Sequence, residues 1–310
     1  MTEARASSQT APRIHIPTPR ERLKWFIHDW VVVPLKIIVR NKKALFGFIV
    51  TLFFIGLAIF GPMVLPPPKT FVCPSEAPPS WQHPLGCDYY GADIWTEIVY
   101  GTRTVLEIAF IAGVITTLVG IAVGMIAGFK GGKVDAVLMG ITDVLMTIPG
   151  LPLLIVLSFI LRNLVANPVL APFVVGAILS VNAWTGLARS IRSQVLALKQ
   201  REFVEAARAL GMSTSYIVFV EIMPNLMSFI AVNFIFSTIG AIYSSIALYY
   251  LAVLPFTAYN WGIMLYMAWN NMDWQTLDAV VGFIILLQLG LFMFSYAVDE
   301  MFNPRLRTEI

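Results

Sequence analysis

Long apolar runs separated by polar segments extend along most of the chain. Six runs are long enough to cross a membrane as helices, which takes about 20 residues for a hydrocarbon core of about 30 Å. They cover residues 44–66, 104–128, 135–161, 171–188, 226–252 and 279–298. The pattern predicts an all-α integral membrane protein whose six transmembrane helices form one domain over residues 44–298.

Composition agrees with lipid as the solvent for most of this chain. Of its 310 residues 58% are hydrophobic and only 13% are charged, whereas soluble domains contain roughly 45–50% and about 25%. An ordinary soluble protein is therefore excluded. Basic residues in a membrane protein mainly report topology, so the net charge of +3 is interpreted as orientation in the lipid bilayer, and no nucleic acid is expected as a partner.

Both ends of the chain are predicted to be cytosolic. Residues 1–43 lack the apolar run of a signal peptide. Within them, residues 21–38 mix aromatic, aliphatic and basic side chains, which favours an amphipathic surface helix over a simple continuation of the tail. If six helices alternate, all but three of the 21 lysines and arginines fall on the cytosolic side, together with the tail at 299–310. The exceptions are Lys69, Arg103 and Arg162.

The two cysteines, Cys73 and Cys87, lie in the predicted outer loop, residues 66–103. The outer compartment is usually oxidising, so a disulfide is one possibility and two free thiols are the other, because the sequence does not give the Cα separation. His83 is the one histidine nearby, and the spacing fits neither a zinc nor a nickel site. We therefore predict no metal site.

The longest hydrophilic stretch between the apolar runs covers residues 189–224, on the predicted cytosolic side. Its distinctive positions are Glu205, Ala206, Ala207, Arg208, Gly211 and Pro224. The pattern predicts two short helices joined at Gly211, which can adopt the positive φ that ends a helix. Val204, Ala207 and Leu210 are expected to form a small apolar face.

This stretch resembles the E-A-A-x-x-x-G loop by which ABC-importer permeases dock on their ATPases, although an incidental amphipathic loop is the alternative. The resemblance implies a coupling helix here, a second homologous permease subunit, two ATP-binding subunits and an extracytoplasmic solute-binding protein. The chain has no G-x-x-x-x-G-K-[ST] motif. ATP and Mg²⁺ are therefore expected in the partner subunits, with no cofactor and no enzymatic activity in this inner-membrane chain.

Further motifs resemble the C-type permeases of the dipeptide, oligopeptide and nickel class. They are residues 83–88 (HPLGCD), 100–103 (YGTR), 128–135 (GFKGGKVD) and 303–307 (NPRLR). The resemblance implies import of oligopeptides or dipeptides. Departures at Cys87, Ala92 and 247–252 leave an oligosaccharide importer as the main alternative. Nickel is disfavoured by the missing histidines, and the E-A-A loop argues against an ATPase-independent transporter.

One face of the fifth predicted span carries small and weakly polar residues. They recur at helical spacing and are Asn233, Ser237, Gly240 and Ser244. The face is interpreted either as a wall of the translocation path or as close helix packing through small residues. Asp143 in the third span is either a functional group of the path or a hydrogen-bonding partner of a neighbouring helix.

The segment after the fifth span is rich in aromatic residues and contains no Lys or Arg between 248 and 274. Aromatic belts at membrane interfaces explain this composition well. The alternative is an outer gate or a stacking surface for the solute. Its candidate residues are Tyr250, Tyr259 and Trp261.

Overall fold

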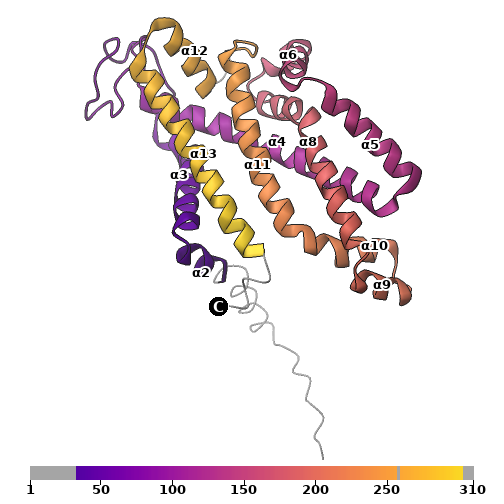
Figure 1. Ribbon diagram of the computed structural model, residues 1–310. Coiled ribbons are helices and arrows are strands. Elements are labelled where there is room, and N and C mark those ends of the chain that lie inside the picture. Colours follow the sequence, from indigo (N-terminus) through magenta and orange to yellow (C-terminus); the bar gives the residue numbers. More distant parts are fainter. Residues whose placement is uncertain (1–32, 257–258, 303–310) are drawn as a thin grey trace, which may run out of the picture.

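The computed structural model describes residues 33–256 and 259–302, and within them the chain is helical without a strand. Five continuous helical segments are long and apolar enough to span a membrane (Figure 1). They are α3 (Lys42–Val64), α4 (Ile94–Lys130), α8 (Ala171–Leu198), the segment Thr214–Tyr250 and α13 (Trp274–Phe302). Most of the amphipathic helix predicted at 21–38 lies outside the described residues, and α2 covers Val33–Arg40.

The third predicted span is not one straight helix. Residues 135–161 are divided between α5 (Gly132–Thr147) and α6 (Gly150–Ile160), whose axes differ by 89°. The break follows from Pro149, because a proline disfavours the helical conformation of the residue before it. Ile148 accordingly has extended backbone angles. The chain has six spans if this bent pair counts as one, and the short helix α7 (Arg162–Val165) follows it.

The fifth span is built from three consecutive helical pieces. They are α10 (Thr214–Tyr216), the π-helix η2 (Ile217–Ile222) and α11 (Met223–Tyr250). Pro224 lies in the first turn of α11, where its missing N–H does not disrupt the helix. The backbone therefore changes from π-helix to α-helix at Met223, immediately before this proline.

The aromatic segment after α11 contains a helix that the hydrophobic pattern did not predict. Helix α12 (Trp261–Asn271) begins after Asn260, whose side chain accepts a hydrogen bond from the Gly262 N–H at 2.8 Å. It ends at Met272, which has left-handed backbone angles. Figure 1 shows α12 near the α3–α4 connection, at the opposite end of the bundle from α9 (Glu202–Ala209).

Small residues allow the long helices to approach closely. Gly124 on α4 faces α8, where a Cβ would lie 2.5 Å from the Ala188 carbonyl oxygen. Gly47 on α3 faces α13 in the same way, since a Cβ would lie 2.2 Å from the Phe294 nitrogen. Such contacts are typical of membrane helices, where packing replaces the hydrophobic effect between helices. Close packing of α4 against α8 and of α3 against α13 therefore holds the helices of the bundle together.

Candidate functional site

Helix α9 contains the Glu-Ala-Ala triplet and ends as the sequence predicts. Gly211 has φ +72°, the left-handed conformation that favours glycine. The Gly211 N–H donates to the Arg208 carbonyl at 2.9 Å, and the Met212 N–H donates to the Ala207 carbonyl at 3.1 Å. These bonds satisfy carbonyl groups at the helix end, so a tight turn separates α9 from α10.

The buried face of α9 attaches it to the transmembrane helices. Val204 is fully buried and Ala207 is 6% exposed. Both belong to one apolar cluster with Ile191 and Val195 of α8 and Ile217 of η2. Burial of such side chains is worth about 25 cal/mol per Å² of apolar area. Movement of α9 is therefore linked to movement of α8 and of the fifth span.

Basic side chains add a contact between this segment and the end of α4. Lys199 Nζ donates to the Phe129 carbonyl at 2.6 Å and lies 5.6 Å from the centre of its ring. The Arg208 guanidinium lies 5.8 Å from the same ring. Cation–π contacts of this kind contribute about 0.5–1 kcal/mol when exposed. Phe129 of α4 therefore contacts both Lys199, immediately after α8, and Arg208 of α9.

The other side of α9 is open. Glu205, Ala206 and Arg208 are exposed. Leu210 is 75% exposed, so the prediction that it joins the apolar face of Val204 was wrong: α9 ends at Ala209, and Leu210 already belongs to the turn. Further large apolar side chains are exposed in this region. They are Phe203, Met212, Phe219 and Val220.

The predicted small-residue face of α11 lines a cavity of about 330 Å³. The four lining residues from this face are Asn233, Ser237, Gly240 and Ser244. Side chains of α4 and α8, including Thr116 and Leu187, form the rest of the wall. A Cβ added to Gly240 would meet nothing within 4 Å. Gly240 is therefore not in a close helix contact within the described residues.

Asp143 does not line that cavity. Its carboxylate pairs with the Arg189 guanidinium of α8, and their side chains are 60% and 50% exposed. A second ion pair joins the same two helices, because Arg192 donates twice to Asp135 at 2.5 Å. The exposed Asp143–Arg189 pair contributes little to stability, whereas the Arg192 and Asp135 side chains are only 31% and 16% exposed. These pairs connect α5 to α8 at the end nearer to α9.

The three candidate gate residues are in different environments. Trp261 is fully buried, donates from Nε1 to the Ile98 carbonyl at 3.1 Å and packs edge-on against Phe54. In this conformation the indole packs between α3 and α4, and its assignment to an outer gate stays a prediction. Tyr250 and Tyr259 are exposed, and the Tyr259 hydroxyl donates to the Pro68 carbonyl at 3.0 Å.

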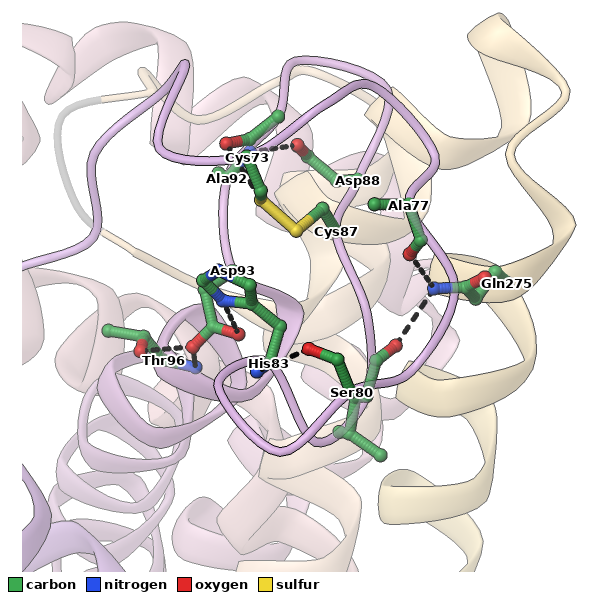
Figure 2. Close-up of polar contacts among 12 residues, drawn as sticks. Cys73, Ala77, Ser80, His83, Cys87, Asp88, Ala92, Asp93, Thr96 and Gln275 are labelled. Carbon is green, nitrogen blue, oxygen red and sulfur yellow. Dashed lines mark hydrogen bonds and ion pairs between the residues drawn. A yellow bond between two sulfur atoms is a disulfide. The ribbon is translucent and has the colours of Figure 1, made fainter.

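Residues 65–93, here called the disulfide loop, connect α3 to α4. Cys73 and Cys87 are bonded, with their Cα atoms 6.5 Å apart (Figure 2). His83 lies beside them, and the three potential ligand atoms are within 4.8 Å of one another. Cysteines bonded to each other offer no thiolate to a metal. The His83 Nδ1 is instead 3.1 Å from Asp93 Oδ1.

Polar side chains bind the disulfide loop to the starts of two long helices. Asp93 caps α4 by accepting from the Thr96 N–H at 3.0 Å. Figure 2 shows Gln275 of α13 donating to the loop, with Nε2 3.1 Å from the Ala77 oxygen and 2.9 Å from the Leu85 oxygen. Gln275 has no signal in the sequence pattern, because its partners lie about 190 residues away.

Asp273 makes the second connection between the loop and α13. Its carboxylate accepts from the Tyr89 N–H at 3.0 Å and from the Thr276 hydroxyl at 2.6 Å. Asp is one of the residues preferred immediately before a helix, so Asp273 could have been recognised as a candidate helix start. In the loop itself, burial raises the pKa of Asp88, although its hydrogen bond from the Ala92 N–H at 2.6 Å acts in the opposite direction.

Comparison with known proteins identifies the family to which this chain belongs. Residues 120–308 match the family described as "Binding-protein-dependent transport system inner membrane component". Residues 35–79 match "N-terminal TM domain of oligopeptide transport permease C". The first match covers α9 and every span after α4, and the second covers α3.

The sequence is 32% identical over 273 residues to the oligopeptide transport system permease protein OppC of Bacillus subtilis (strain 168), covering 86% of this chain and 87% of OppC. It is 34% identical over 230 residues to the dipeptide transport system permease protein DppC of the same strain, covering 73% and 69%. A solved inward-facing MetNI methionine ABC transporter chain has 19% identity and a TM-score of 0.49, covering 66% of this chain and 94% of that chain. With its apolar helices, this chain belongs to the binding-protein-dependent transport family as a multi-pass inner membrane component.

Proposed function

We propose that this chain is the C-type permease subunit of an ATP-driven importer of oligopeptides or dipeptides. Two relatives that share most of its length are named as oligopeptide and dipeptide permeases, and this observation carries the proposal. The other parts of the importer would be a second homologous permease subunit, two ATP-binding subunits and an extracytoplasmic solute-binding protein. ATP and Mg²⁺ would be held by the ATP-binding subunits, because this chain has no phosphate-binding motif.

Helix α9 is proposed as the coupling helix, on the cytosolic side together with both termini. Its exposed surface around Ala206 offers small and apolar side chains to another protein. Its buried surface, Val204 and Ala207, contacts the cluster that includes α8 and η2. A force applied to α9 by closing ATPases would therefore turn these helices as a rigid body. Gly211 ends this helix, Glu205 lies on its exposed side, and Pro224 lies in the first turn of the helix that α9 would move.

The cavity beside Gly240 is proposed as this subunit's part of the translocation path. It is lined by weakly polar side chains, including Ser237 and Ser244, and its open space at Gly240 would face the second permease subunit. Such a surface lets a solute pass without holding it tightly. Asp143 lies outside this cavity and is proposed to stabilise the arrangement of α5 and α8 through Arg189.

The ATPase activity of the reconstituted importer tests the proposal. The cognate binding protein is loaded in turn with short peptides and with oligosaccharides, and stimulation of ATP hydrolysis is measured in lipid vesicles. We expect stimulation by peptides alone. Stimulation by oligosaccharides alone would replace the proposed cargo, and stimulation by neither in an assembled complex would contradict the importer assignment.

A matched pair of variants tests the coupling role. Ala206→Trp places a bulky side chain on the exposed surface of α9, and Ala166→Trp does the same beside α7. We expect the first to abolish stimulation by a loaded binding protein and the second to retain it. Equal stimulation in both variants would exclude docking at this surface of α9.

A further inference from the structure

A second cavity, of about 600 Å³, lies between α3, α4, α11 and α13. Most of its wall is aliphatic and aromatic, and the polar lining residues are Thr51, Arg103, Glu107 and Thr238. The Thr238 hydroxyl is already used, because it donates to the Phe234 carbonyl at 2.9 Å. A water molecule needs about two to four polar partners, so an apolar cavity of this kind does not hold water stably. The wall therefore favours an apolar occupant.

The depth of the cavity matches one leaflet of a bilayer. Its α3 wall extends from Thr51 to Met63, about 18 Å at a rise of about 1.5 Å per residue. Half of a hydrocarbon core of about 30 Å is about 15 Å. The lining residues Ile59, Met63 and Phe110 are exposed, so the described chain does not cover this side of the cavity. An acyl chain of the surrounding lipid therefore fits the cavity in polarity and in depth.

An ion pair lies at one end of this apolar cavity. Arg103 Nε donates to Glu107 Oε1 at 2.8 Å, and the two side chains are 55% and 42% exposed. Tyr100, one turn earlier on α4, donates from its hydroxyl to the carbonyl of Leu65, the residue that caps the end of α3. The pair therefore lies close to the end of a membrane-spanning helix, where the headgroups of a bilayer begin.

Both members of the ion pair keep accessible hydrogen-bonding atoms. Within residues 33–256 and 259–302, the terminal nitrogens of the Arg103 guanidinium have no acceptor, and Glu107 Oε2 has no donor. A guanidinium binds phosphate oxygens with parallel N–H groups, and a carboxylate oxygen accepts from a primary ammonium. Pockets between membrane helices bind lipid headgroups through such contacts. A headgroup that carries both a phosphate and a primary ammonium complements this pair in charge.

We infer that this cavity binds phosphatidylethanolamine, with one acyl chain between the helices, the phosphate at Arg103 and the ammonium at Glu107. Phosphatidylcholine has a quaternary ammonium without an N–H donor, and phosphatidylglycerol has no ammonium. Neither lipid can therefore donate an ammonium hydrogen bond to Glu107. The inference goes beyond the proposed function, because it holds whichever solute the chain helps to carry.

Photoactivatable phospholipids test the site in the full chain, purified with the subunits that accompany it. The vesicles contain equal parts of phosphatidylcholine and phosphatidylglycerol. Three probe lipids carry the same diazirine-bearing acyl chain and differ only in their headgroups, which are ethanolamine, choline and glycerol. Labelled residues are located by mass spectrometry. We expect labelling within residues 51–63 and 234–238 to be about tenfold stronger with the ethanolamine lipid, because it alone makes both charged hydrogen bonds.

Substitutions in the ion pair assign the preference to its two members. Glu107→Gln removes the charge at nearly constant shape and should remove the preference for the ethanolamine lipid over the choline lipid. Arg103→Gln should weaken labelling by all three lipids, because each of them carries a phosphate. Glu76→Gln and Arg162→Gln are the matched controls, since both residues are exposed and lie outside the cavity. An unchanged preference in Glu107→Gln would overturn the proposed headgroup contact.

Filling the cavity tests the position of the acyl chain. Ala58 lines the cavity, and Ala58→Phe places a ring in the space that the chain would occupy. Gly56→Phe is the control on the same helix, because Gly56 lies outside the cavity and a Cβ there would meet nothing within 4 Å. We expect labelling within residues 234–238 to be lost in the first variant and retained in the second. Retained labelling in Ala58→Phe would contradict an acyl chain between these helices.

The unaltered chain can contradict the inference by itself, however the variants fold. Equal labelling by the three lipids would exclude recognition of the headgroup. Absence of labelling in both segments with every probe would exclude a lipid and would leave a helix of another subunit as the occupant of the cavity.

Discussion

At the disulfide-loop end of the bundle, a disulfide closes the loop and polar side chains join it to a segment about 190 residues away, whereas at the α9 end apolar burial provides most of the attachment. Gln275 and Asp273 of the α13 start bind backbone groups of the loop. Helix α9, in contrast, is attached through Val204 and Ala207 and through contacts with Phe129.

The two ends of the bundle differ in the kind of contact that holds their exposed segments in place. Directional bonds hold the disulfide loop in one arrangement against α4 and α13, and the loop also exposes the large apolar side chains of Phe71 and Trp81. The α9 end leaves large apolar side chains exposed, including Leu210 and Phe219. Exposed apolar patches of this kind mark surfaces that another protein covers. Both ends therefore offer apolar side chains to other proteins, but directional bonds hold the disulfide loop, whereas apolar burial holds α9.

The largest expected effect is loss of the attachment of α9. Val204→Asp places a carboxylate in a fully buried apolar site, which costs several kcal/mol unless the helix detaches. We expect ATP-binding subunits to stop copurifying with the variant, and amide exchange in α9 to accelerate while the disulfide loop stays protected. Glu202→Gln, on the exposed side of the same helix, is the control and should behave like the unaltered chain. Normal copurification of Val204→Asp would mean that α9 does not need this anchor.

The next effect is at the other end. Replacing Cys73 and Cys87 together by Ser removes a cross-link over 14 residues, a change worth about 3 kcal/mol for a loop of about 15 residues. We expect faster proteolysis within the disulfide loop and unchanged exchange in α9. Ser75→Ala, which removes one hydrogen bond to the Tyr89 carbonyl, is the control in the same loop. Equal cleavage rates in the two variants would show that the polar contacts alone hold the loop.

A smaller effect on the stability of the disulfide loop is expected when Asp273, at the start of α13, is replaced. Asp273→Ala removes the acceptor shared by Tyr89 and Thr276, which should lower the free energy of opening of the loop by about 1–2 kcal/mol. Amide exchange at Tyr89 measures this change directly. Asp278→Ala, an exposed carboxylate on the same helix, should leave that exchange rate as it is. If both variants exchange alike, Asp273 does not fix the loop.

The sequence predicts features that depend on local or one-dimensional properties. Hydropathy located the long spans because lipid requires continuous apolar helices. The positive φ of Gly211 followed from the polar segment's own pattern. The bend between α5 and α6 was missed, although Pro149 was visible, because apolar content alone does not distinguish a straight span from a bent one.

Features that depend on distant partners could not be predicted in this way. Trp261 belongs to an aromatic-rich segment, and only the packing of α12 on α4 shows that its ring is buried. Asn260 lies outside every predicted span, and only the folded chain shows that its side chain is buried and caps α12. The pairing of Cys73 with Cys87 was one of two possibilities until their Cα separation was known.

The smallest expected effect concerns Asp88, whose buried carboxyl has a raised pKa because burial disfavours its charged form. The folded state therefore binds the proton more tightly than the unfolded chain does, so the contribution of Asp88 to stability is largest below the ordinary value of 3.8 and is lost as pH rises through the folded-state pKa. Asp88→Asn keeps an oxygen that can accept from the Ala92 N–H and removes the titration.

We expect the Asn variant's unfolding temperature to be equal to or higher than that of the unaltered protein at pH 7, with the difference shrinking as pH falls toward 4. Thermal unfolding of both proteins across this range measures the effect, and Glu76→Gln, an exposed carboxylate in the same loop, should follow the unaltered protein. A difference that instead grows at low pH would mean that charged Asp88 stabilises the loop. The polar contacts at this end would then depend on its charge, and the contrast with the apolar attachment of α9 would be sharper.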